Sequence, residues 1–214
     1  MFISRKSYKP KTKHLKQEVV SDLWHTGLAN FNHNNYVTGL GKSLYLLKLI
    51  SGHIETNSII LELGCSVGRN LNILRAYGYR PFGVEYSRKA ITKKTTTCPI
   101  NVCSIENYYE NYHKAGIMEI LGNKIDLTFS MISLGFLMPE SEWVFKEMVE
   151  TSRYIATIEN EVDGEPEYVA RDYREIFTNL GCKQVKHLGT NFNPFFDGFW
   201  EKPGRVHGRL FKVK

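Results

Sequence analysis

Short apolar runs alternate with amphipathic stretches along the chain from Ser58 onward. Each apolar run predicts a strand, and each amphipathic stretch, opened by Gly or Ser, predicts a helix. The predicted strands are Ile59–Leu63, Pro81–Val84, Ile100–Cys103, Leu127–Met131 and Tyr154–Ile158, and the predicted helices are Arg69–Tyr77, Arg88–Thr95, Asn107–Leu121, Ser141–Thr151 and Tyr168–Leu180. Strands that alternate with helices are typical of a parallel sheet with helices on both faces.

The end of the chain breaks this alternation. Lys183–Leu188 and Arg205–Val213 follow one another without a helix between them, so they should pair antiparallel. The sequence therefore predicts an α/β fold with a seven-stranded sheet, in which five parallel βα units end in an antiparallel β-hairpin.

Two more helices are predicted ahead of the first strand, because apolar residues recur at helical spacing in Glu18–Phe31 and Gly39–Ser51. The chain thus divides into an N-terminal arm (residues 1–17), a helical segment (residues 18–57) and an α/β domain (residues 58–214). A length of 214 residues fits one domain with a sizeable core.

The net charge of +6 is concentrated in the arm. Six basic residues precede the first acidic residue, Glu18, which leaves 22 basic and 22 acidic residues in the rest of the chain. A basic arm can hold phosphates, although Lys-rich termini are also often only solvated. Residues 5–16 are therefore one possible contact for a nucleic acid.

Composition excludes several other classes. No apolar run approaches the roughly 18–20 residues that a membrane-spanning helix needs, and the first residues lack a secretory signal, so a cytoplasmic protein is expected. The four cysteines show neither a C-x-x-C pair nor a companion His spacing. We therefore expect reduced thiols and no metal site.

A glycine-containing turn joins the first strand of the α/β domain to its helix. The segment Ile59–Asn70 contains Glu62, Gly64 and Gly68, and a second carboxylate, Glu85, ends the next strand. In open α/β sheets, ligands bind beyond the carboxyl ends of the strands, where glycines let the backbone approach and a helix N-terminus offers N–H groups. A carboxylate at Glu85 can accept both hydroxyl groups of a ribose.

This segment resembles the first motif of class I S-adenosylmethionine-dependent methyltransferases, with Ser66 in place of the middle glycine of Gly-x-Gly-x-Gly. The resemblance covers nearly all of residues 58–214 and implies a Rossmann-like fold, S-adenosylmethionine as cofactor and S-adenosylhomocysteine as product. It implies cofactor contacts at Glu62, Gly64, Cys65, Ser66, Gly68, Asn70, Glu85, Tyr86, Ser104, Ile105 and Met131. It also implies that Asp126 is the acidic start of the fourth-strand motif that backs the transferred methyl group. An NAD-binding domain fits less well, because it requires G-x-G-x-x-G.

The methyl acceptor should lie beyond strands four and five, where Ser133 and Asn160 are the candidate substrate-binding residues, and beside the aromatic loop that carries Phe195, Phe196 and Trp200. Five carboxylates between Glu159 and Glu167 could hold a cationic acceptor against those rings, so an amine is one candidate. A carboxylate run is equally typical of a solvated loop, and an aromatic loop of satellite core.

A catalytic base is needed only if the acceptor has a proton to lose. In related folds the N-terminal helices cover the cofactor, so residues 18–57 are expected to form a lid that supplies His25 and Tyr36 as candidates, while Glu159 is the candidate from strand five. Three hypotheses follow: a methyltransferase for a small molecule, an RNA or DNA methyltransferase that uses the arm, and a non-catalytic cofactor-binding protein.

Overall fold

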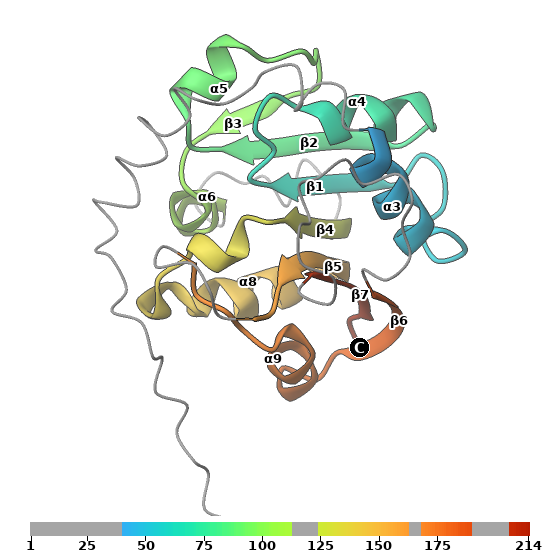
Figure 1. The fold of residues 1–214 in the computed structure, drawn as a ribbon, viewed down its shortest axis with the longest axis vertical. Coiled ribbons are helices and arrows are strands. Elements are labelled where there is room, and N and C mark those ends of the chain that lie inside the picture. The colour runs from blue at the N-terminus through green and yellow to red at the C-terminus, as the bar shows by residue number, and fades with distance from the viewer. Residues whose placement is uncertain (1–39, 113–123, 163–167, 190–205) are drawn as a thin grey trace, which may run out of the picture.

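The computed structural model describes residues 40–112, 124–162, 168–189 and 206–214, which form one sheet covered by helices on both faces (Figure 1). The strand order is β3-β2-β1-β4-β5-β7-β6. The strands are β1 (Ile59–Leu63), β2 (Arg80–Glu85), β3 (Ile100–Val102), β4 (Ile125–Met131), β5 (Ser152–Asn160), β6 (Lys183–Gly189) and β7 (Val206–Lys212). The first five are parallel, and β7 pairs antiparallel with both β5 and β6. The predicted architecture is confirmed.

The helices divide between the two faces of the sheet. They are α3 (Leu40–Ile50), α4 (Arg69–Ala76), α5 (Arg88–Thr92), α6 (Ile105–Tyr112), α8 (Trp143–Thr151) and α9 (Tyr173–Asn179), with short 3-10 turns at Leu134–Phe136 and Pro139–Ser141. Leu46, Leu49 and Leu74 of α3 and α4 pack on the face that carries Ile60 and Phe129. The helices α6, α8 and α9 lie together on the opposite side of the sheet (Figure 1).

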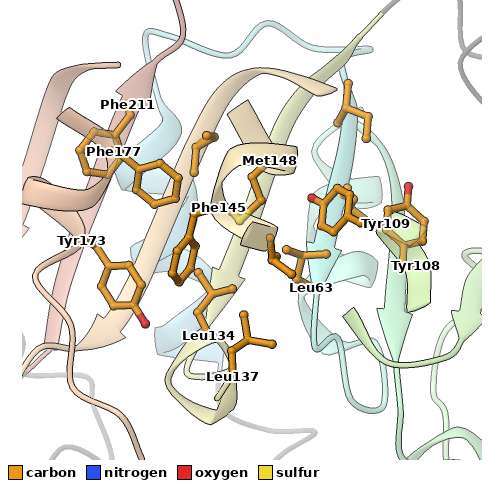
Figure 2. Packing of buried hydrophobic residues seen from close by; sticks show 14 of the residues in the cluster. Leu63, Tyr108, Tyr109, Leu134, Leu137, Phe145, Met148, Tyr173, Phe177 and Phe211 are labelled. Carbon is orange, nitrogen blue, oxygen red and sulfur yellow. The ribbon is translucent and has the colours of Figure 1, made fainter. Parts of the chain in front are cut away.

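The larger core cluster fills the space between the sheet and α6, α8 and α9. Leu63 of β1 packs there with Met148 and Phe145 of α8, and Figure 2 shows these side chains between strand and helix. The Phe145 ring meets the Phe177 ring edge-on, with centroids 5.9 Å apart. Burying each such side chain stabilises the fold by about 1.5–3 kcal/mol, which fixes the sheet that carries the site.

Some predicted element ends shift because local caps decide them. The last helix begins at Tyr173 rather than Tyr168, since the Asp172 carboxylate accepts a hydrogen bond from the Glu175 N–H at 2.9 Å. Likewise α6 begins at Ile105 rather than Asn107, because Ser104 Oγ accepts from the Asn107 N–H. The predicted helix Arg88–Thr95 ends at Thr92.

The helix predicted at Gly39–Ser51 is confirmed as α3, which packs on a face of the sheet. The helix predicted at Glu18–Phe31 lies outside the described residues, so the lid stays a prediction. All four cysteines are free thiols. Over the four described ranges, the model contains no helix with the length and apolar character to span a membrane.

Candidate functional site

The parallel strands end along one edge of the sheet and bring the predicted cofactor residues together there. The strands β1, β2, β4 and β5 end at Leu63, Glu85, Met131 and Asn160. The turn after β1 crosses towards β2, because the Gly64 and Cys65 N–H groups both donate to the Val84 carbonyl, at 2.9 and 3.0 Å. Residues 64–68 are named the glycine turn below.

Both glycines of this turn are required by its geometry. Gly64 has φ +77° and Gly68, which precedes α4, has φ +84°, a region that L side chains rarely adopt. A Cβ on Gly64 would also collide with the Ser133 side chain, and a Cβ on Gly68 with Thr96. The glycine turn is therefore packed directly against the residues that follow β4.

Ser66 adopts φ +50° although it is not a glycine. Its N–H donates to Glu85 Oε2 at 2.7 Å, and this bond holds the turn in its conformation. Beside it, Cys65 is buried against Gly83 of β2, and burial raises the pKa of its thiol. Cys65 thus packs as an apolar group rather than as a reactive thiolate.

The Glu85 carboxylate joins the glycine turn to the start of α5. Its Oε1 accepts from the Ser87 N–H at 2.6 Å while Oε2 accepts from Ser66, and burial raises its pKa against the effect of these bonds. Each carboxylate oxygen can accept a second hydrogen bond. The next residue, Tyr86, exposes 42% of its surface. Glu85 is thus fixed in place with acceptor capacity remaining.

Glu62 is the most deeply buried acid of the glycine-turn region. Its Oε1 accepts from Asn70 Nδ2 at 2.6 Å, and Asn70 Oδ1 in turn accepts from the Ser43 hydroxyl of α3 at 2.6 Å. Glu62 Oε2 is buried and finds no hydrogen-bond partner among the described residues. Burial raises the pKa of Glu62 to about 8. An unmatched buried carboxylate oxygen is costly, and a polar ligand group would satisfy it.

Met131 and the start of α4 close this part of the site. The Met131 sulfur lies 3.8 Å from both Arg69 Nη2 and Asn70 Nδ2. On the far side of Glu85, Ser104 and Ile105 follow β3 and are both half-buried. The structure thus brings Met131 to the glycine turn, and Ser104 and Ile105 to the edge at β3.

Beyond β4 and β5 lie the residues predicted to face the acceptor. The Ser133 N–H donates to Glu159 Oε1 at 3.1 Å, and the Asn160 N–H donates to the Tyr168 hydroxyl at 3.0 Å. Glu159 is fully buried at the end of β5. Its role as a catalytic base stays a prediction, as do the substrate contacts of Ser133 and Asn160.

Asp126 lies at the start of β4, as the motif resemblance implies, and away from the glycine turn. Its Oδ2 accepts from the N–H of Ile59, the first residue of β1, at 2.8 Å, and its Oδ1 pairs with Arg153 at 3.6 Å. Because Asp126 lies near the start of β4, it belongs to the opposite edge of the sheet from the glycine turn. It ties strands together and cannot back a methyl group at the other edge.

Several predicted site residues lie outside the described residues, namely His25, Tyr36, Phe195, Phe196 and Trp200. Conversely, sequence reasoning missed Ser43, Tyr168 and Arg171, which support Asn70 or the residues after β4. Tyr168 and Arg171 fell inside a predicted helix. No local pattern marks them, because Ser43 and Arg171 bond to partners 27 and 34 residues away, and Tyr168 to a partner nine residues away, which no helix or strand period relates.

Comparison with known proteins identifies the fold. Magnesium protoporphyrin IX methyltransferase from Synechocystis, solved with S-adenosylmethionine bound, matches with a TM-score of 0.64 at 12% identity, over 95% of this chain and 100% of that one. A SAM-dependent methyltransferase from Archaeoglobus fulgidus gives 0.62 at 13% identity, over 85% and 97%. Another from Leishmania major gives 0.62 at 18%, over 92% and 82%. This chain has the class I methyltransferase fold.

No protein-family model and no curated protein sequence matches the chain. The methyltransferase fold is therefore recognised through its architecture and not through overall sequence similarity. Within that fold, the glycine turn, Glu62 and Glu85 lie at the carboxyl edge of the sheet, where the motif resemblance predicts the cofactor.

Proposed function

We propose that this protein is an S-adenosylmethionine-dependent methyltransferase that acts on a small molecule. The observation that carries the proposal is the buried Glu62 Oε2 at the glycine turn, which has no partner among the described residues. The cofactor carries an ammonium group that would satisfy such an oxygen. Glu85, Gly64 and Gly68, which lie at the same edge of the sheet, would contact the rest of the cofactor.

Each described group has a role in this proposal. Glu62 would accept a hydrogen bond from the amino group, and Glu85 would accept the ribose hydroxyls with its remaining lone pairs. Gly64 and Gly68 would let the backbone come close to the cofactor. Their positive φ angles and tight contacts leave no room for a side chain at either position. Tyr86 would offer an exposed ring beside Glu85.

The bound cofactor supplies a methyl group activated by a sulfonium. The protein's own contribution is to align an acceptor and exclude water, which supplies much of the acceleration in such transfers. Met131 presents an apolar side chain at the end of β4 beside the glycine turn. Ser133, packed against Gly64, would present a polar side chain on the acceptor side of the turn.

The carboxylates between Glu159 and Glu167 were candidates to bind a cationic acceptor, and the structure describes two of them. Of its carboxylates, Glu159 is fully buried, and Glu161 forms a bidentate ion pair with Arg209 at 2.7 and 2.6 Å. Neither presents a free charge to a cation. An amine acceptor would therefore depend on Asp163, Glu165 and Glu167, which lie outside the described residues.

Calorimetric titration with S-adenosylmethionine and S-adenosylhomocysteine tests the donor half of the proposal. The wild type should bind both, and Glu85→Ala should weaken binding about 10–100-fold, because the ribose loses its acceptor and Ser66 loses its anchor. Asp126→Ala is a matched control, since this carboxylate lies at the opposite edge and should leave affinity unchanged.

Equally poor binding by the wild type and Glu85→Ala would overturn the proposal. If the wild type binds and Glu85→Ala binds more weakly, a methyl-transfer screen of amines, carboxylic acids and RNA separates an enzyme from a non-catalytic cofactor-binding protein. Transfer to a small amine or acid supports the proposal, whereas transfer to RNA alone or to no acceptor contradicts it.

A further inference from the structure

The turn that follows β4 is held in a strained conformation. Ile132 has φ +56°, and a β-branched side chain in the left-handed region costs on the order of 1–3 kcal/mol. Such a conformation persists only where surrounding contacts over-determine it. Residues 131–134, named the β4 turn below, must therefore be fixed by specific partners.

Glu159 provides those partners from β5. Its Oε1 accepts from the Ser130 hydroxyl at 2.7 Å and from the N–H groups of Ser133 and Leu134 at 3.1 and 3.2 Å. Its Oε2 accepts from the Tyr168 hydroxyl at 2.7 Å. Four donors therefore surround a carboxylate that has no exposed surface, and two of them belong to the strained turn.

A second layer packs behind this carboxylate. A Cβ on Gly135 would collide with the Tyr168 ring, and the Gly135 carbonyl accepts from the Val169 N–H at 2.7 Å. The buried Arg171 guanidinium donates to the carbonyls of Leu134 and Leu137 at 3.1 and 2.7 Å. Residues 168–171 thus contact the residues after β4 through both backbone and side-chain groups.

The β4 turn also packs against the glycine turn and the start of α4. Ser133 packs against Gly64 so closely that no side chain fits at Gly64, and Met131 lies beside Arg69 and Asn70. We propose that Glu159 is a positioning residue that holds the β4 turn against the glycine turn and so sets the shape of the cofactor site. This inference rests on the proposed function.

The same geometry argues against Glu159 as the catalytic base. A base must reach the acceptor directly or through one water. Glu159 is fully buried, and Ser133, Leu134 and Ser130 occupy one of its oxygens while Tyr168 occupies the other. It therefore acts through the turn that it holds.

Binding of S-adenosylhomocysteine, measured by calorimetry, tests the positioning role. Glu159→Ala should weaken binding at least about tenfold, because the β4 turn relaxes away from Gly64. Glu159→Gln should stay within about threefold of the wild type, because its amide oxygen keeps the three donors of Oε1 and its amide nitrogen can donate to Tyr168. Glu161→Ala is the matched control, a buried carboxylate two residues on that contacts Arg209 and should not change affinity.

Amide hydrogen exchange provides the second readout. The Ser133 and Leu134 amides should exchange at least about tenfold faster in Glu159→Ala, while the Leu61 amide in β1 keeps its rate. If Glu159→Ala does not fold, Tyr168→Phe replaces it. This variant loses the bond to Glu159 and the bond from the Asn160 N–H, keeps the ring against Gly135 and leaves the Ser130, Ser133 and Leu134 donors on Glu159, so a smaller change in the same direction is expected.

The outcomes separate the two proposals. A wild type that binds the probe, with Glu159→Ala as tight as Glu161→Ala and the two amide rates unchanged, overturns the positioning role and leaves the proposed function intact. A wild type that binds neither form of the cofactor defeats the proposed function. In that case the positioning role falls with it.

Discussion

At the scale of single residues, three carboxylates define the candidate site, and burial raises the pKa of each. Backbone N–H groups donate to Glu85 and Glu159 and so counter part of the effect of burial on their pKa values. Glu62 accepts only from the side-chain amide of Asn70 among the described residues, on one of its two oxygens. Among the three, Glu62 is therefore the group whose protonation should respond most to pH and to a ligand.

The pH dependence of stability should report this carboxyl. With a folded pKa of about 8 against an ordinary value near 4.5, the folded protein holds a proton on Glu62 that the unfolded chain releases. The free energy of unfolding should consequently fall as pH rises from about 5 to 8. Denaturant titrations across this window measure it, and Glu62→Gln should flatten the slope.

A matched comparison makes this test specific. Glu62→Gln keeps an oxygen for Asn70 Nδ2 but cannot ionise, so it should be more stable than the wild type at pH 8 and similar at pH 5. Parallel pH curves for wild type and Glu62→Gln would contradict a raised pKa at this position.

At the scale of elements, one hydroxyl of α3 bonds to both strands at the antiparallel end of the sheet. Tyr45 Oη donates to the Leu188 carbonyl of β6 at 2.6 Å and accepts from the Gly208 N–H of β7 at 3.1 Å. Burial raises the pKa of Tyr45 to about 12, so the hydroxyl stays protonated at physiological pH. This bridge connects α3 to β6 and β7.

Tyr45→Phe should therefore lower the free energy of unfolding by about 1–3 kcal/mol, because two backbone groups lose a partner in a buried place. Thermal or urea unfolding measures the change. Tyr79→Phe is a suitable control, since within the described ranges the Tyr79 hydroxyl makes only a long 3.4 Å bond to the Ile54 carbonyl and is less buried. A loss of equal size in both variants would show that the bridge has no special weight.

Among the elements, strands could be predicted from the sequence more accurately than the starts of helices. Strands are set by local apolar runs, so β1, β4 and β5 were found close to their true bounds. Helix starts depended on single capping groups such as Asp172, which a periodic pattern does not weigh. The motif resemblance assigns Glu62 and Glu85 to one cofactor site, and both lie at the edge where the parallel strands end.

What escaped prediction depends on contacts between distant segments. Asp126 opens the fourth-strand motif, but the motif does not indicate its bonds to Ile59 and Arg153, which lie far from it in the sequence. The links from Glu159 to Tyr168 and from Arg171 to Leu137 join residues that no short-range period relates. Such buried polar networks are specified by the packed fold and become visible only in it.

At the scale of the whole molecule, charge separates the N-terminal arm from the rest. The six basic residues between residues 5 and 16 account for the net charge, and the remaining chain is balanced. An RNA or DNA methyltransferase would use these residues to hold phosphates. A small-molecule enzyme would not need them.

Removing residues 1–16 decides between these uses. If the acceptor is a small molecule, the truncated protein should keep the cofactor affinity and transfer rate of the full chain within about twofold, since the described site draws on residues from Ser43 onward. If the acceptor is RNA, binding should weaken and the slope of log K against log salt should fall by several units, because each lost phosphate contact removes about 0.7–0.9 of a unit. Fluorescence anisotropy with a labelled RNA, measured between 50 and 200 mM salt, provides the slope. The truncated chain could instead lose transfer to a small amine while still binding S-adenosylhomocysteine. That result would assign the arm to the acceptor side of the site, and would contradict the expectation that a small-molecule enzyme does not need the arm.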